Sequence, residues 1–151
     1  MVAKRQSAEE SHSTPPGSGP FRRLDHVGIA VWSADAVIPY YRDTLGLELV
    51  GDEIAEEPGT RLVYFKAGQS FIQLVEPVSE TTEIRQWLAE HGEGLHHFCL
   101  VVDDLASAAE VSEVPDDVTV FRAGRDRNAC FLNGVVPASV RIEVTETHPS
   151  R

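Results

Sequence analysis

An internal repeat constrains the fold of this chain more than any other sequence feature. The segment LDHVGIAV at residues 24–31 matches LHHFCLVV at residues 95–102, and the match places His26 on His97, 71 positions later. Both segments alternate and are rich in β-branched or aromatic side chains, which is typical of strands. Because repeats determine architecture, the chain should consist of two similar halves.

Two further matches extend the repeat. RLVYFKAG at residues 61–68 aligns with RNACFLNG at residues 127–134, and FIQLVEP aligns with VRIEVTE, which pairs Gln73 with Glu143. The spacing of the three matches differs by a few residues, as ordinary changes in loop length would produce. The order of the elements and the residue types capable of binding a metal repeat together, and this agreement supports the repeat more strongly than the few identities do.

Hydrophobic periodicity predicts a strand, a helix and three further strands in each half. The expected strands are residues 24–31, 47–53, 61–68, 70–77, 95–102, 118–124, 127–134 and 138–146, and the expected helices are 33–45 and 103–113, with a linking helix at about 80–91. Residues 21–146 should form a single domain. Residues 1–20 are rich in Ser, Pro, Gly and Glu and are predicted to be a disordered tail, as are residues 147–151.

Each half contributes one histidine and one oxygen-bearing side chain to a candidate metal site. Strand alternation places His26, Gln73, His97 and Glu143 on the faces opposite the aliphatic side chains that would pack on helices. The same alternation turns His96 away from the site. Two imidazoles, one carboxylate and one amide oxygen suit Co²⁺, Mn²⁺, Ni²⁺, Fe²⁺ or Zn²⁺ and leave positions open for a chelating substrate. The predicted fold class is therefore α+β, with two βαβββ repeats forming a paired, partly open mixed-sheet barrel around a metal cleft.

With these residues in place, the chain resembles the vicinal oxygen chelate superfamily. This superfamily includes glyoxalase I, extradiol dioxygenases, bleomycin-resistance proteins and methylmalonyl-CoA epimerase, and the likeness to the epimerases is the closest. It runs from about Leu24 to Glu146, through LDHVGIAV, YYRDTLGLELV, EEPGTRLVYF, IQLVEP, IRQWLAEHGEGLHHFCLVVDD and VRIEV. The resemblance implies one divalent metal ion per chain, ligated by His26, Gln73, His97 and Glu143, and a homodimer.

The sequence departs from the epimerase pattern in two places. Bacterial epimerases often carry a glutamate base three residues after the glycine of the turn that EEPGT resembles, and Leu62 stands there. The loop NGVVPAS between the last two strands lacks the HP-containing segment typical of epimerases. Both departures lie where the substrate would bind, so they leave its identity open.

The resemblance implies a reaction in which a metal ion binds two neighbouring substrate oxygens and stabilises an enolate. Glu143 is the first candidate for the proton-transfer base, and Glu76 is a weaker one because it lies on the opposite strand face from Gln73. Four arginines are candidates for holding a substrate carboxylate or phosphate, because guanidinium binds oxyanions bidentately. They are Arg61, Arg122, Arg125 and Arg127.

Three functions are compatible with these residues. The first is an epimerase or isomerase of an acyl thioester, and the second is a glyoxalase-type lyase or a polyketide or natural-product tailoring enzyme on the same metal site. The third is a resistance protein that binds an antibiotic, although such proteins of this fold do not use the metal ligands. A dioxygenase is less favoured, because its usual site has two histidines and one carboxylate, and Gln73 would add a fourth ligand.

The composition of the chain argues against several classes of binding partner and favours a small-molecule partner. The formal net charge of −11 argues against nucleic-acid binding and against an anionic membrane surface. No apolar run reaches the roughly 18 residues of a membrane span, and the N-terminus has no apolar signal-peptide segment, so we expect a cytoplasmic protein. Cys99 and Cys130 belong to no CxxC pair and are predicted to be reduced, buried thiols.

Overall fold

The computed structural model describes residues 15–56, 58–106, 120–132 and 136–147. Most of the predicted N-terminal tail, the end of the C-terminal tail and all but the start of the predicted helix 103–113 lie outside these ranges. Within them, no helix combines the length and the apolar composition that crossing a membrane requires. Cys99 and Cys130 are both buried and unpaired, as predicted.

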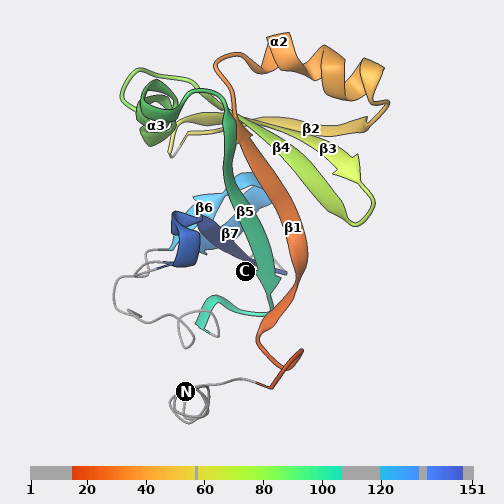
Figure 1. The fold of residues 1–151 in the computed structure, drawn as a ribbon, viewed down its shortest axis with the longest axis vertical. Coiled ribbons are helices and arrows are strands. Elements are labelled where there is room, and N and C mark those ends of the chain that lie inside the picture. The colour runs from red at the N-terminus through yellow and green to blue at the C-terminus, as the bar shows by residue number, and fades with distance from the viewer. Residues whose placement is uncertain (1–14, 57, 107–119, 133–135, 148–151) are drawn as a thin grey trace, which may run out of the picture.

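Eight strands form one mixed sheet whose two ends mirror each other. The strands are β1 (Phe21–Ala30), β2 (Glu48–Ala55), β3 (Thr60–Ala67), β4 (Ser70–Pro77), β5 (Gly94–Val102), β6 (Phe121–Ala123), β7 (Arg127–Phe131) and β8 (Ile142–Glu146). Their order across the sheet is β2-β3-β4-β1-β5-β8-β7-β6. β1 and β5 pair antiparallel in the middle, where Figure 1 shows them side by side, and each pairs in parallel on its other edge with the last strand of its own half, β4 or β8. This arrangement confirms the α+β fold of two related halves.

Two helices pack on opposite faces of the first half, because the side chains of β3 alternate. Val63 and Phe65 point to the face covered by α2 (Ala34–Pro39), where Ala34 and Ile38 are buried against them. Leu62 and Tyr64 point to the other face and pack with Ile84 and Leu88 of α3 (Glu83–His91). The second face carries the candidate site, and α3 forms one of its walls.

Local sequence signals explain the helix ends. The Ser33 hydroxyl accepts a hydrogen bond from Ala36 N at 3.3 Å and caps α2. Pro39 ends the α-helical part earlier than predicted, because proline has no N–H to continue the ladder, and a π-helical turn, Tyr40–Thr44, follows it. Gly46 then adopts a positive φ of 72°, which ends the helical segment as expected. In α3, Thr82 is the N-cap and Gly92 ends the helix, so the predicted linking helix is confirmed with a later start.

Among the described residues, the last three strands, β6, β7 and β8, are shorter than predicted. β6 spans three residues and gives way to a 3-10 turn, Gly124–Asp126, in which Arg125 has a positive φ of 58°. The predicted strand 138–146 begins only at Ile142. Pro137 starts a 3-10 turn in which Ala138 and Ser139 adopt positive φ values of 60° and 53°, so residues 138–141 lie outside the strand, although the Arg141 carbonyl accepts from Phe98 N at 3.3 Å.

Candidate metal centre

The four predicted ligands converge beside the central strand pair, and all four side chains are buried. His26 Nε2 lies 3.1 Å from His97 Nε2 and 3.1 Å from Glu143 Oε1, and His97 Nε2 lies 3.6 Å from Glu143 Oε1. Nitrogen and oxygen ligands that share one ion at about 2.1 Å lie roughly 3.0–3.4 Å from one another. The two 3.1 Å distances lie within this range and the 3.6 Å distance lies slightly above it, so the three atoms are close enough to approach a common divalent ion.

Strand register brings these residues together. Gly28 on β1 pairs with Gln73 on β4 and with His97 on β5. Cys99, the residue that matches Gly28 in the second half, pairs with His26 and with Glu143 on β8. The four candidate ligands therefore occupy equivalent places around the axis that relates the halves.

Gly28 leaves room for the ring of His97. A Cβ atom at Gly28 would lie 2.1 Å from His97 Cε1, closer than any allowed contact. The glycine is needed here for close approach, and not for its backbone conformation.

Two β-bulges place further side chains beside the candidate ligands. In the pairing of β1 with β5, Leu24 and His26 face Leu100 and Cys99, so Asp25 has no partner residue across the ladder. On β5 the pairing passes from His97 to Leu95 in the same way and leaves out His96. A bulged residue does not follow strict strand alternation. The prediction that His96 turns away from the site is wrong for this reason: its Nδ1 lies 2.8 Å from His97 Nδ1, and His96 lines the pocket.

Asp25 is fully buried and holds His26 in place. His26 Nδ1 donates to Asp25 Oδ2 at 2.6 Å, which leaves Nε2 facing the other candidate ligands. Arg125 forms an ion pair with the same carboxylate, and Arg127 Nη1 lies 3.4 Å from Asp25 Oδ1. The Arg125 N–H also donates to Glu53 on β2 at 2.6 Å, so this network ties the second half to the first.

The two histidines differ in proton affinity. Burial opposes protonation of His26, but hydrogen bonds to Asp25 and Glu143 outweigh it and raise the pKa of His26. His97 has no such acid behind it, and burial lowers the pKa of His97 to about 4. Burial favours the neutral acid form of Glu143, yet its hydrogen bond with His26 and the nearby His97 hold the pKa of Glu143 below its usual range. The site thus presents a carboxylate beside one neutral imidazole and one readily protonated imidazole.

Gln73 provides an independent test of whether the site fits a metal. Its Nε2 donates to the Tyr64 hydroxyl at 3.0 Å, which fixes the orientation of the amide. The amide oxygen is buried and has no hydrogen-bond partner among the described residues. Buried polar atoms are almost always satisfied, so an unsatisfied amide oxygen next to two imidazoles and a carboxylate fits a fourth metal ligand.

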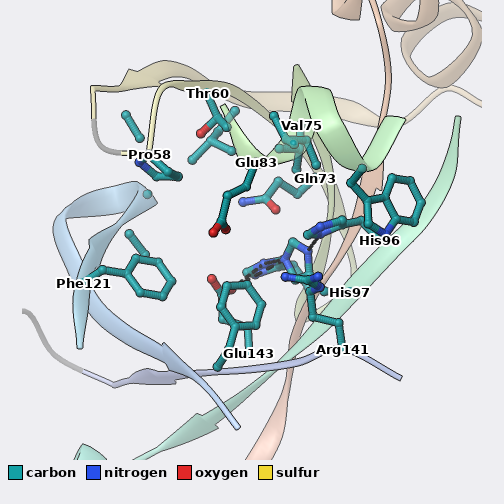
Figure 2. Close-up of a pocket in the computed structure, with 18 of the residues that line it drawn as sticks. Pro58, Thr60, Gln73, Val75, Glu83, His96, His97, Phe121, Arg141 and Glu143 are labelled. Atoms are coloured by element: carbon teal, nitrogen blue, oxygen red, sulfur yellow. Dashed lines mark hydrogen bonds and ion pairs between the residues drawn. The ribbon is translucent and has the colours of Figure 1, made fainter. Parts of the chain in front are cut away.

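A pocket of about 390 Å³ opens over the cluster. Figure 2 shows Gln73, His97 and Glu143 at one side of it, with Glu83 of α3 and Phe121 of β6 on the other walls. Both halves and α3 contribute to the lining, which includes Thr60, Leu62, Tyr64, Val75, Trp87, Glu90, Phe131 and Arg141. The shape and the mixed apolar and polar lining suit a small molecule that reaches the candidate ligands.

The predicted arginines are distributed unequally around the pocket. Arg125 lines it, but its guanidinium is engaged by Asp25 and lies over the ring of Tyr64 at 5.0 Å. Arg61 pairs with Asp52 at 2.8 Å and with Asp35 at 3.0 Å, outside the pocket lining.

Arg122 and Arg127 also lie outside the lining, where Arg122 Nη1 donates to the Asp126 carbonyl at 3.0 Å and Arg127 contacts Asp25. The weaker candidate base, Glu76, accepts a hydrogen bond from Ala34 N at 2.6 Å and stabilises the start of α2 instead of facing the pocket. Of the four predicted arginines, Arg125 alone reaches the pocket.

Sequence reasoning missed four residues of the pocket. Arg141 lies two positions before Glu143, a spacing that could have identified it, and its guanidinium lies 5.5 Å from the centre of the Phe131 ring. Glu83, Trp87 and Glu90 recur at the spacing of one helix face, the signal that one side of α3 faces a common surface. No sequence signal indicated that this surface is the pocket.

The family profile of the glyoxalase/bleomycin resistance protein/dioxygenase superfamily matches residues 25–131. The chain belongs to this superfamily. The match covers β1 through β7 and so includes three of the four candidate ligands, His26, Gln73 and His97. The superfamily prediction made from the sequence is confirmed.

Named relatives are methylmalonyl-CoA epimerases. The chain is 32% identical over 89 residues to an ethylmalonyl-CoA/methylmalonyl-CoA epimerase of Cereibacter sphaeroides, over 58% of this chain and 66% of the relative. The structure superposes with a TM-score of 0.78 on methylmalonyl-CoA epimerase from Mycobacterium tuberculosis, at 28% identity over 93% of this chain and 96% of that one. It superposes with a TM-score of 0.75 on a Streptomyces coelicolor methylmalonyl-CoA epimerase variant in complex with 2-nitronate-propionyl-CoA, at 32% identity over 85% and 99% of the two chains. The sequence matches span between 57% and 66% of the length of the first curated relatives.

Proposed function

We propose that this protein is an epimerase of 2-substituted malonyl thioesters of the methylmalonyl-CoA type and that it acts with one divalent metal ion. The observation that carries the proposal is the cluster of His26, His97 and Glu143, with the unsatisfied amide oxygen of Gln73 in the lining of the same pocket. The named epimerases among the relatives support the choice of substrate class.

In this proposal His26, Gln73, His97 and Glu143 hold the metal ion. When bound, a divalent ion supplies Lewis-acid stabilisation for negative charge that develops on a thioester oxygen. The donor set has one charged ligand and three neutral ones, which suits Co²⁺, Mn²⁺, Ni²⁺, Fe²⁺ or Zn²⁺. Asp25 orients His26 and Tyr64 orients Gln73, so two of the four side chains have an outer partner that fixes their direction.

The pocket residues bind the substrate and move its proton. Arg141 lines the pocket and has no carboxylate partner among the described residues, so its guanidinium is available for the substrate carboxylate. In this proposal Glu143 accepts or returns the proton at the carbon between the two carbonyl groups, because its carboxylate lines the pocket. Leu62, Val75 and Phe131 give this part of the pocket an apolar lining that limits water.

A solvent-exchange experiment tests the proposal. The protein loaded with Co²⁺ is incubated with methylmalonyl-CoA in D₂O, and deuterium at Cα is followed by NMR together with the interconversion of the two epimers. We expect both signals to appear together. Absence of deuterium at saturating Co²⁺ would rule out the epimerase and leave the fold and the metal site standing.

Metal binding is tested separately, by elemental analysis of protein purified without chelator and by titration with Co²⁺. We expect close to one ion per chain, and less than a tenth of an ion with no gain on adding Co²⁺ would rule out the metal site. The homodimer and the cytoplasmic location stay predictions from the sequence.

A further inference from the structure

The wall of the pocket formed by α3 carries two carboxylates that face the candidate metal centre. Glu83 and Glu90 both line the pocket, and Trp87 lies between them on the same helix face. Figure 2 shows Glu83 reaching from α3 into the pocket with its carboxylate turned toward Glu143. Two acids from different elements therefore face each other across the space that a substrate would fill.

An epimerase needs a proton carrier on each side of the reacting carbon, and the pocket offers few groups for the side away from Glu143. Leu62 on β3 has no proton to exchange. The Tyr64 hydroxyl already accepts a hydrogen bond from Gln73 Nε2 at 3.0 Å. His96 lies beside the candidate ligands, with its Nδ1 2.8 Å from His97 Nδ1. The two acids of α3 are the groups that remain.

Position distinguishes the two acids. Glu83 is the first residue of α3, directly after Thr82, whose hydroxyl accepts from Arg85 N at 3.2 Å and caps the helix. Thr82 is buried against Gly59, where a Cβ atom would lie 2.9 Å from Thr82 Cγ2, so this turn is packed tightly. Glu90 follows two helical turns later, about 10 Å along the axis. Both acids are exposed and can exchange protons with solvent, so they differ in their place along α3 and in the tight packing of the turn beside Glu83.

We propose that Glu83 is the second proton carrier of the reaction, on the face of the substrate carbon opposite Glu143; this assignment rests on the proposed epimerase function. For one epimer, the Glu143 carboxylate takes the Cα proton. The C–H bond breaks, an O–H bond forms, and the electron pair moves onto the thioester oxygen as an enolate. The Glu83 carboxylic acid then donates its proton to the other face of Cα, the C–H bond forms there, and Glu83 is left ionised. For the other epimer the two residues exchange roles, and solvent restores the starting protonation.

The test compares E83Q with wild type, both loaded with Co²⁺, on each epimer of methylmalonyl-CoA separately in D₂O. We expect E83Q to epimerise at least about 100-fold more slowly, the usual loss when a general acid or base is removed. One epimer should still exchange its Cα proton, through Glu143, while the other should not. Epimerisation by E83Q within about threefold of wild type would overturn the assignment, and so would an equal loss of exchange from both epimers.

The matched control is E90Q, which changes an acid on the same helix face and in the same pocket. We expect its epimerisation rate to stay within about threefold of wild type, and a loss as large as that of E83Q would overturn the distinction between the two acids. Calorimetric titration should give E83Q the Co²⁺ affinity of wild type, and a tenfold loss would make Glu83 part of the metal site instead. Absence of exchange in wild type would remove the proposed function itself, a result that the E83Q comparison cannot produce.

Discussion

In the first half of the molecule the candidate metal-binding histidine is backed by an acid, and in the second half by another histidine. Asp25 and His96 occupy equivalent bulges on β1 and β5, and each contacts the Nδ1 of the following histidine, His26 or His97. The acid raises the pKa of His26, whereas His97, without one, has a pKa of about 4. The comparison teaches that the repeated backbone sets where the candidate ligands stand, while the acid behind His26, which has no counterpart behind His97, separates the pKa values of the two histidines.

Replacing Asp25 should have the largest effect, a loss in the free energy of unfolding that replacing His96 does not produce. Asp25→Asn leaves Arg125 and Arg127 without their buried carboxylate, and loss of one partner from a buried ion pair costs about 3–5 kcal/mol. His96→Gln removes no charge and should cost less than about 1.5 kcal/mol, the lower range for single substitutions. Urea unfolding at pH 7 measures both. Equal losses would show that the two bulges do not differ as described.

The same carboxylate gives the stability a predictable pH dependence. Burial opposes ionisation of Asp25, but the hydrogen bond from His26 and the charge of Arg125 outweigh it, so the folded pKa of Asp25 lies below its unfolded value of about 3.9. A depressed folded pKa contributes stability that is complete above the unfolded pKa and is lost as pH falls through the folded one. Between about pH 5 and pH 3 the unfolding free energy of wild type should therefore fall more steeply than that of Asp25→Asn. Parallel profiles would contradict this origin of the acid sensitivity.

Gly28 and Cys99, each two positions after a candidate ligand histidine, differ in the room available for a side chain. Gly28 lies under the His97 ring, whereas its counterpart Cys99 carries a side chain in the same place. Gly28→Ala forces the ring to move and should cost about 1–3 kcal/mol, together with most of the Co²⁺ affinity. Cys99→Ala leaves both histidines in place and should keep Co²⁺ binding within about threefold of wild type. Calorimetric titration checks the affinities, and full Co²⁺ binding by Gly28→Ala would show that the His97 position is not critical.

The oxygen ligands are also held differently in the two halves. Gln73 depends on the hydroxyl of Tyr64 for its orientation, while Glu143 lies against His26 directly. Tyr64→Phe keeps the ring and removes the hydroxyl, and loss of such an outer partner lowers metal affinity by roughly 10- to 100-fold. Phe131→Leu, a change near Glu143 that removes no hydrogen bond, is the control and should leave Co²⁺ affinity nearly unchanged. An unaltered affinity in Tyr64→Phe would mean that Gln73 is not a ligand.

The sequence predicted the order of the elements along the chain and the four converging side chains. Both predictions depend on local periodicity and on a repeat, which can be recognised without knowledge of packing. The sequence failed at His96 and at residues 138–141, where a bulge and a positive-φ turn interrupt the alternation on which the prediction rested. It also could not place Glu83, because the direction in which α3 packs across the sheet is decided by contacts of Ile84 and Leu88 with Leu62 and Val75, far away in sequence.

The smallest expected effect concerns the residue two positions before each oxygen ligand, Phe71 in the first half and Arg141 in the second. Phe71 is covered by Arg125 at 4.9 Å, whereas Arg141 offers its charge to the pocket. An exposed ion pair contributes about 1 kcal/mol at most, so Arg141→Gln should raise KM for methylmalonyl-CoA about fivefold and leave kcat unchanged. The matched control is Arg61→Gln, because Arg61 is engaged by Asp52 outside the pocket lining and should not affect KM. Repeating the measurement with the pantetheine thioester, which lacks the nucleotide phosphates, separates the two anions: an equal rise in KM assigns Arg141 to the substrate carboxylate, and a rise confined to the CoA substrate assigns it to a phosphate.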